Sequence, residues 1–210
     1  MQVPNMLTLS RFFIAAGIMA LLAIDMQFFK SFALLLFIVG GITDYLDGYL
    51  ARNVYGVSSF GKLMDPLADK VMVCACFVAF VEIQIPIETL SSGDIITVSL
   101  VPAWIVVIII AREFMVTGLR LLAANKGRTI SAGKWGKHKT VWQIIAIVVI
   151  LLGLAIRSDI LRDTDALVLG TFEFGLRWTA LALSVAVALI TVASGVKYIS
   201  EHSDLVTRNM

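Results

Sequence analysis

Six stretches of mostly apolar residues, each 17 to 22 residues long, follow one another along this chain of 210 residues. A helix that crosses a lipid bilayer needs about 20 such residues. Of all residues 59% are apolar and only 15% are charged, whereas soluble domains have about 45–50% and about 25%. This composition excludes a soluble globular domain and a disordered or collagen-like chain. The expected spans are Leu7–Ile24, Ser31–Arg52, Pro66–Ile85, Ile95–Ala111, Thr140–Ile156 and Trp178–Val196.

These spans predict an all-α integral membrane protein with six transmembrane helices in a single domain over residues 1–210. The sequence shows no repeat of fixed period, no low-complexity tract and no separate soluble domain. No basic segment precedes the first apolar stretch, so we expect a retained span there rather than a cleaved signal peptide. Cys74 and Cys76 lie two residues apart in an apolar run, where a disulfide is disfavoured.

The basic residues predict which side of the membrane each loop faces. If the N-terminus is cytoplasmic, four of the 17 Lys and Arg residues fall on the outer side and the other 13 on the inner side. Such an excess is typical of the cytoplasmic side. We therefore expect a multi-pass protein of the cell (inner) membrane with both termini in the cytoplasm. The charged residues expected outside are Lys30, Arg157, Arg162, Arg177, Glu82, Glu88, Asp94, Asp159, Asp163, Asp165 and Glu173.

The second and third stretches carry carboxylates into the predicted membrane helices. The purely apolar part of the second stretch, Ser31–Ile42, is too short to span alone, so its helix must continue through Asp44 and Asp47. These two residues are spaced i, i+3 and share a helix face. Asp65 and Asp69 open the third stretch at i, i+4 and share a face as well. Four carboxylates are therefore expected to approach one membrane boundary from neighbouring helix ends. In the predicted orientation this boundary, and with it the candidate active site, is on the cytoplasmic side.

Four carboxylates at a membrane boundary indicate a metal site. Ionised carboxylates near hydrocarbon are costly and are usually paired or functional, which makes a merely solvated acidic rim a poor explanation. Mg²⁺ and Mn²⁺ prefer oxygen ligands and commonly bridge carboxylates to substrate phosphates. Two such ions can stabilise the attacking and leaving oxygens of a phosphoryl displacement.

The aspartates are part of a longer pattern over residues 44–69, which reads Asp44-x2-Asp47-Gly48-x2-Ala51-Arg52-x8-Gly61-x3-Asp65-x3-Asp69. This pattern resembles the signature of the CDP-alcohol phosphotransferase family. Its members are membrane enzymes with six transmembrane helices, and the resemblance implies the CDP-alcohol phosphotransferase fold. The resemblance implies transfer of a substituted phosphoryl group from a CDP-linked donor to an alcohol, with release of CMP. It also implies a homodimer and two divalent ions on the four aspartates, with Asp69 as the general base. The nucleotide site is then lined by Gly48, Ala51, Arg52 and Gly61.

Three further stretches are similar to one branch of this family, the phosphatidylglycerophosphate synthases. They read Pro4-Asn5-Met6-Leu7-Thr8-Leu9-Ser10-Arg11, then Ala111-Arg112-Glu113-Phe114 with Gly118-Leu119-Arg120, and Gly136-Lys137-His138-Lys139-Thr140 with Gln143. The resemblance implies CDP-diacylglycerol as donor and glycerol 3-phosphate as acceptor, giving phosphatidylglycerophosphate and CMP in anionic phospholipid biosynthesis. On this interpretation Asn5, Thr8 and Arg11 also belong to the donor site. Residues 144–210 carry no functional signal of their own.

Four basic residues are candidates for holding the acceptor's phosphate. Glycerol 3-phosphate is a small dianion, and Arg and Lys are the side chains that bind phosphate. Arg112 and Arg120 are eight residues apart, near one helix face, at the inner boundary. Lys137 and Lys139 precede the fifth span at the same boundary. The alternative is that they only follow the positive-inside rule or hold anionic lipid headgroups.

Other functions remain open on the sequence alone. The nearest alternative keeps the chemistry and changes the acceptor to serine or inositol phosphate. An aspartate-rich membrane prenyltransferase usually needs more spans and lacks the Gly48-x2-Ala51-Arg52 portion of the pattern. A cation transporter would place its carboxylates near the bilayer midplane, whereas these four lie at one end. The expected partners are the lipid bilayer and a second copy of the chain, and no nucleic acid.

Overall fold

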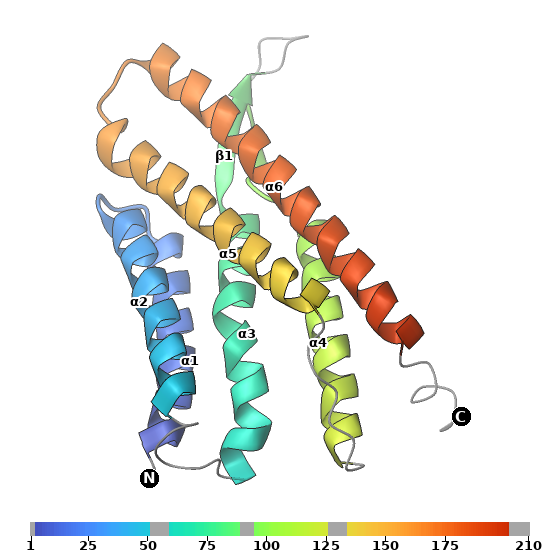
Figure 1. Cartoon of the computed structure of the whole chain (residues 1–210). Helices are drawn as coiled ribbons and strands as arrows, with labels where there is room; N and C mark the ends of the chain where they lie inside the picture. Colours follow the sequence, from blue (N-terminus) through green and yellow to red (C-terminus); the bar gives the residue numbers. More distant parts are fainter. Residues whose placement is uncertain (1–2, 51–58, 89–94, 126–133, 202–210) are drawn as a thin grey trace.

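The fold is taken from a computed structural model, which describes residues 3–50, 59–88, 95–125 and 134–201 (Figure 1). Within these ranges, the side chains of residues 3–8, 44–50, 59–66, 69, 87–88, 125 and 134–137 are not described. The elements, in chain order, are α1 (Val3–Ala23), α2 (Phe29–Leu50), α3 (Ser59–Glu82), β1 (Gln84–Glu88), β2 (Ile95–Ser99), α4 (Ala103–Asn125), α5 (Lys134–Ala155), the π-helical turn η2 (Ile156–Ile160) and α6 (Ala166–Glu201).

The described part of the chain is mostly helical, and every predicted span overlaps one of its six helices. An unpredicted antiparallel pair of strands corrects the expectation of a wholly α-helical chain. Ile95–Ser99, predicted as the start of a span, instead forms β2 and pairs with β1, with Ile85 opposite Val98. The β-branched run in β2 suits a strand. Pro102 directly precedes the start of α4, where its missing N–H interrupts no helical hydrogen bond.

The last helix also differs from its prediction. α6 begins at Ala166, twelve residues before the expected start at Trp178, and its 36 residues correspond to about 54 Å of helix. Glu173, which was expected in an outer loop, is therefore helical and only 4% exposed. It accepts a hydrogen bond of 2.6 Å from the Nε of Arg157 in η2. This pair joins the first part of α6 to η2, which directly follows α5.

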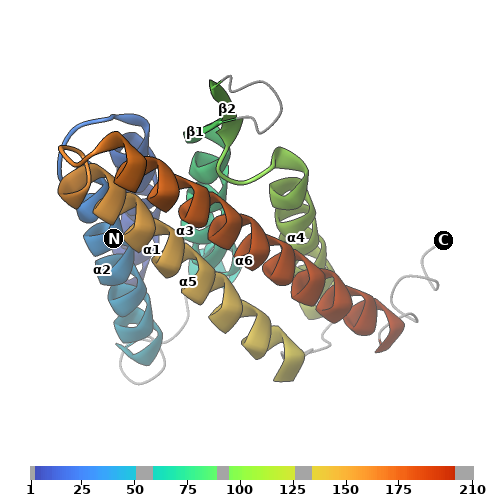
Figure 2. The same cartoon turned by 90° about the horizontal axis from the view of Figure 1, so that it is seen from above.

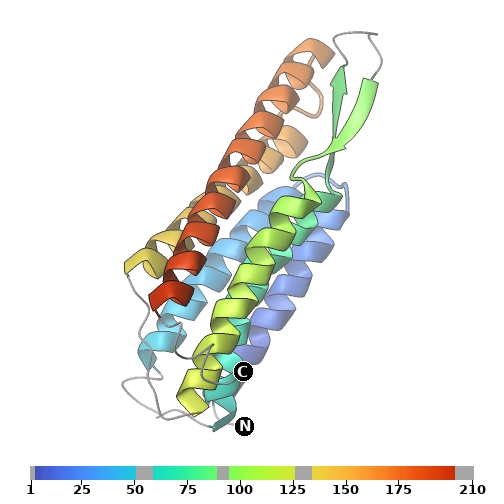
Figure 3. The same cartoon turned by 90° about the vertical axis from the view of Figure 1, so that its right-hand side faces the viewer.

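The six helices form two sets, one of α1, α2, α3 and α4 and the other of α5 and α6. α1 packs against both α2 and α3, while α5 packs against α6 and α2. Figures 1 and 2 show α5 and α6 side by side, slanting across the other four helices. Figure 3 shows the strand pair beyond the ends of α3 and α4, beside the first part of α6. Fully buried apolar side chains fill the space between the sets, among them Ile18, Phe77, Phe80, Ile147 and Leu151.

The exterior of the bundle is apolar, as a membrane protein requires. Every helix exposes large apolar side chains, for example Phe13, Leu35, Val78, Val107, Leu152 and Leu189. Soluble proteins rarely expose extended apolar surfaces. In the described ranges, His138–Ile160 and Ala166–Glu201 are long and apolar enough to cross a membrane, and Leu9–Ala23 and Phe29–Thr43 form shorter apolar helical segments. These features are those of a membrane protein, and the crossing of all six helices stays a prediction.

Candidate active site

The structure places the predicted aspartates on two helices. Asp44 and Asp47 lie in the last two turns of α2, and Asp65 and Asp69 lie near the start of α3. Both positions are at the same end of the bundle, near the beginning of α1 (Figure 1). The helical spacings on which the prediction rested are therefore present in the backbone. The four aspartate side chains lie outside the described ones.

The predicted donor-site residues that the structure describes lie on α1, α2 and α3. Gly48 is in α2 and Gly61 is in α3, while Ala51 and Arg52 lie outside the described residues. Asn5 and Thr8 are in the first turns of α1, and their side chains are not described. Arg11, one turn further along α1, is buried with 7% exposure. The start of α1 lies at the end of the bundle that carries the aspartates (Figure 1).

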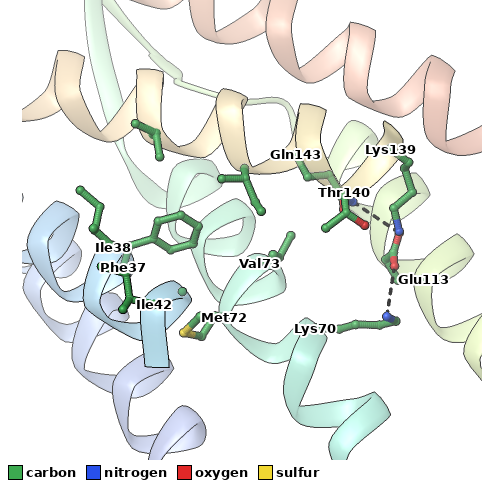
Figure 4. A pocket seen from close by; sticks show the side chains of 13 residues that line it. Phe37, Ile38, Ile42, Lys70, Met72, Val73, Glu113, Lys139, Thr140 and Gln143 are labelled. Carbon is green, nitrogen blue, oxygen red and sulfur yellow. Dashed lines mark hydrogen bonds and ion pairs between the residues drawn. The ribbon is translucent and has the colours of Figure 1, made fainter. Parts of the chain in front are cut away.

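A cavity of about 460 Å³ lies beside these helix ends, between α2, α3, α4 and α5. Lys70, which follows Asp69, lines it from α3, and Ile42, two residues before Asp44, lines it from α2. Figure 4 shows an apolar wall formed by Phe37, Ile38, Ile42, Met72 and Val73 and a polar corner formed by Lys70, Glu113, Lys139, Thr140 and Gln143. The cavity can hold an apolar group and a charged group side by side.

Glu113 is at the centre of the polar corner and is 3% exposed. Its Oε1 atom accepts a short hydrogen bond from the Nζ of Lys139. Longer hydrogen bonds of 3.4 Å reach the same atom from Gln143 Nε2 and Arg112 NH1. The Oε2 atom lies 3.8 Å from the Nζ of Lys70 (Figure 4). A buried carboxylate needs such partners because burial removes its hydration.

Arg112 links this corner to the last helix. Its NH2 donates a hydrogen bond of 2.6 Å to the Oγ of Ser194 in α6. A Cβ atom on Gly195 would lie 3.0 Å from the Cγ of Arg112, so glycine leaves room for the arginine at this helix contact. Arg112 is 9% exposed and therefore depends on these neighbours for its polar contacts.

The predicted phosphate-binding residues divide into two places. Lys139 and Arg112 meet at Glu113, whereas the guanidinium of Arg120 stacks over the ring of Tyr198 at 5.5 Å, further along α4. The side chain of Lys137 is not described. Sequence reasoning missed Lys70 and Glu113 as members of the site, although an isolated carboxylate in an apolar stretch is itself a sign of function.

The described side chains include only part of the candidate metal site. Among the described side chains, no three His, Cys, Asp or Glu residues gather in a way that could hold an ion. The four aspartates fall outside that set, so the predicted metal site stays a prediction. Their oxygen donors nevertheless suit a hard divalent cation.

Comparison with known proteins identifies relatives over most of the chain. Residues 1–193 match the family described as CDP-alcohol phosphatidyltransferase. A Bacillus subtilis (strain 168) protein named CDP-diacylglycerol–glycerol-3-phosphate 3-phosphatidyltransferase is 40% identical over 168 residues, which cover 80% of this chain and 72% of the relative. Proteins of the same name from Mycoplasma pneumoniae and Rickettsia typhi are 32% and 34% identical, covering 90% and 72% of this chain and 84% and 77% of the relatives. The family match extends into α6, beyond the stretches that carried a signal in the sequence.

Proposed function

Because the chain belongs to the CDP-alcohol phosphatidyltransferase family, we propose that it transfers the phosphatidyl group of CDP-diacylglycerol to glycerol 3-phosphate. The products are phosphatidylglycerophosphate and CMP. The relatives named for this reaction, up to 40% identical to the chain, support the choice of donor and acceptor. The observation that carries the proposal within the structure is the cavity with a basic corner beside the aspartate-bearing helix ends.

The metal and base roles follow from the chemistry of the four carboxylates. Asp44, Asp47, Asp65 and Asp69 would hold two divalent ions, Mg²⁺ or Mn²⁺, because two helix ends supply them at one end of the bundle. Bound ions of this kind offset the charge of a pyrophosphate and of the leaving nucleotide. Asp69 would accept the proton of the acceptor's primary hydroxyl, whose oxygen attacks the phosphorus that bears the lipid. Its neighbour Lys70 lines the cavity, which supports placing the acceptor there.

The donor is proposed to bind with its nucleotide near the ends of α2 and α3. Small residues at 48, 51 and 61 would let the nucleotide approach the backbone, and Arg52 would contribute a positive charge. Asn5, Thr8 and Arg11 would reach the donor's pyrophosphate from α1. The diacylglycerol chains can remain in the bilayer, because the cavity wall and the outer faces of the helices are apolar.

The acceptor's phosphate is proposed to bind at the basic corner. Lys139 lines the cavity directly, and Arg112 reaches the same carboxylate from α4. Arg120 and Lys137 extend the basic region at the neighbouring helix ends. A phosphate held here could form charge-assisted hydrogen bonds, which are stronger than hydrogen bonds between neutral groups.

The membrane arrangement is part of the proposal. Six helices would cross the cell membrane, with both termini and the active site on the cytoplasmic side and with two chains forming a homodimer. The excess of basic residues at one set of helix ends supports this orientation. Cysteines introduced at Ser59 and Thr164, after removal of Cys74 and Cys76, test it in intact cells. An impermeant thiol reagent should label position 164 and spare position 59, and the reverse result would contradict the orientation.

Release of CMP from CDP-diacylglycerol tests the reaction. Purified protein with Mg²⁺ or Mn²⁺ should release CMP fastest with glycerol 3-phosphate among glycerol 3-phosphate, serine and inositol phosphate. Faster release with serine or inositol phosphate would move the assignment to another acceptor. No release with any acceptor would overturn CDP-diacylglycerol as the donor.

A further inference from the structure

The polar corner contains more positive than negative charge. Lys70, Lys139 and Arg112 all approach Glu113, and among the described side chains no other carboxylate pairs with these three cations. The corner is largely buried, since Lys139 and Arg112 are 5% and 9% exposed. Counted over the described side chains of the corner, three cations and one carboxylate leave a formal surplus of two positive charges. A buried surplus of charge is unfavourable unless an anion completes it.

A glycerol 3-phosphate molecule would supply the missing charge. A phosphate monoester carries about −1.5 to −2 charges at pH 7, which matches the surplus at this corner. The cavity beside the corner is large enough for a small anion, at about 460 Å³. Serine, which carries one positive and one negative charge, would leave the surplus in place.

From this arrangement we infer that Glu113 is a positioning residue that holds Lys139 and Lys70 in place to bind the acceptor's phosphate. The inference rests on the proposed function and adds a role for two residues outside the predicted phosphate-binding set. Glu113 is on α4, whereas the two lysines come from α5 and α3. A single carboxylate thus fixes cations from two other helices on one wall of the cavity. In this role Glu113 acts through the lysines and need not touch the substrate.

The physical reason lies in the length of the lysine side chain. A free lysine side chain has a flexible stem of four carbons and loses much rotamer freedom when it binds an anion. Contact with Glu113 restricts both ammonium groups before the acceptor arrives, and preordered groups bind with a smaller entropic loss. Gln143 and Arg112 contact the carboxylate on the same oxygen as Lys139 and thereby fix its orientation.

The test compares the variants Glu113→Ala and Glu113→Gln with the wild-type protein. We expect Glu113→Ala to raise the KM for glycerol 3-phosphate by about tenfold or more, while the KM for CDP-diacylglycerol changes by less than about twofold. Glu113→Gln should have a smaller effect of the same kind, because the amide oxygen still accepts a hydrogen bond from Lys139. Binding of glycerol 3-phosphate without donor, measured by calorimetry with Mg²⁺ present, should weaken in the same order.

A second buried glutamate provides the matched control. Glu173 is as buried as Glu113, at 4% exposure, and pairs with Arg157 at the other end of the bundle. Glu173→Gln should lower thermal stability without separating the two KM values. If it raises the acceptor KM as Glu113→Gln does, the effect of Glu113 is merely structural and the inference is wrong.

The outcomes separate this inference from the proposed function. Equal changes in both KM values, or no change in either, would overturn the role of Glu113 even if the wild type is active. If Glu113→Ala does not fold, the same comparison with Glu113→Gln decides. If the wild type releases no CMP but binds glycerol 3-phosphate in a Glu113-dependent way, the proposed function fails and the inference stands. If the wild type binds no glycerol 3-phosphate, the inference fails as well.

Discussion

The two ends of the bundle use buried charges in different ways. At the end with the strand pair, Arg157 and Glu173 form a single ion pair, and the Nζ of Lys30 donates hydrogen bonds to the carbonyl oxygens of Leu22 and Ile24 at the end of α1. At the other end, three cations share the carboxylate of Glu113. The first set is satisfied by a carboxylate and by carbonyl oxygens of the chain itself. Among the described side chains the second set has fewer anions than cations, and we propose that this difference marks the end of the bundle that binds a substrate.

Asp159 extends the contrast. Its carboxylate accepts a hydrogen bond of 2.9 Å from the backbone N–H of Phe28 and hydrogen bonds from the hydroxyls of Ser31 and Ser158. It thereby satisfies a backbone donor at the start of α2, as a helix cap does. All of these acceptors and donors belong to the chain itself. The hydrogen bonds of Asp159 therefore connect η2 to the start of α2. Substitutions should therefore affect stability at one end and substrate use at the other.

The largest expected effect is at the aspartates. Asp44→Asn, Asp47→Asn, Asp65→Asn and Asp69→Asn each keep the shape of the side chain and remove a negative charge. We expect each to reduce kcat nearly to background, and loss of the base Asp69 alone should cost about 10²–10⁴-fold. Asp69→Asn should retain more metal affinity than Asp44→Asn, as measured by titration with Mn²⁺. Full activity of any variant would remove that aspartate from the assignment.

The basic corner should show the next largest effect. Lys139→Ala and Arg112→Ala each remove a charged donor to the acceptor's phosphate. A hydrogen bond to a charged group contributes about 1.5–3 kcal/mol, so kcat/KM for glycerol 3-phosphate should fall by about 10–150-fold. Arg112→Lys should also lose activity, because a bidentate guanidinium becomes a point charge.

A cation at the other end serves as the control for these variants. Arg162 is exposed and lies between η2 and α6. Arg162→Ala should leave both KM values unchanged. If Lys139→Ala and Arg112→Ala impair only the use of CDP-diacylglycerol, the basic corner belongs to the donor and the acceptor assignment is wrong.

A smaller effect is expected where α6 meets Arg112. Gly195→Ala would place a Cβ atom 3.0 Å from the Cγ of Arg112 and displace the side chain from Ser194. The KM for glycerol 3-phosphate should rise a few-fold. Gly175→Ala in the same helix is the matched control, because its Cβ would meet no atom within 4 Å. Identical kinetics of the two alanine variants would show that this contact does not position Arg112.

The smallest effect on activity is expected at the end with the strand pair. Arg157→Ala leaves Glu173 buried without its cation, and an unsatisfied buried polar group costs about 1–3 kcal/mol of stability. The Tm of the detergent-solubilised protein should fall by several degrees while kcat and both KM values are retained. A loss of substrate affinity without a loss of stability would break the distinction between the two ends.

The helices and the aspartate positions could be predicted because their signals are local. An apolar run of about 20 residues and an i, i+3 or i, i+4 spacing are read from neighbouring residues alone. The boundaries were less accurate, since α3 begins at Ser59 whereas its span was predicted from Pro66. Residues 59–65 are helical without being strongly apolar, so hydropathy could not reveal them.

The strand pair and the basic corner could not be predicted in this way. β1 and β2 pair residues that are up to 15 positions apart, such as Gln84 and Ser99. Glu113 bonds Lys139 and Gln143, which are 26 and 30 residues away on another helix. Both arrangements depend on how helices and strands pack in space. The sequence therefore indicated the residue types of the site and missed the carboxylate that brings the cations together.

The central claim is that this chain joins a phosphatidyl group to glycerol 3-phosphate. The most direct measurement supplies purified protein with CDP-diacylglycerol, Mg²⁺ and equal concentrations of labelled glycerol 3-phosphate and labelled serine, and then identifies the labelled lipid. The account predicts phosphatidylglycerophosphate as the main product, formed in equal amount to CMP and absent with Asp69→Asn. Phosphatidylserine as the main product, or labelled lipid formed equally well by Asp69→Asn, would contradict it.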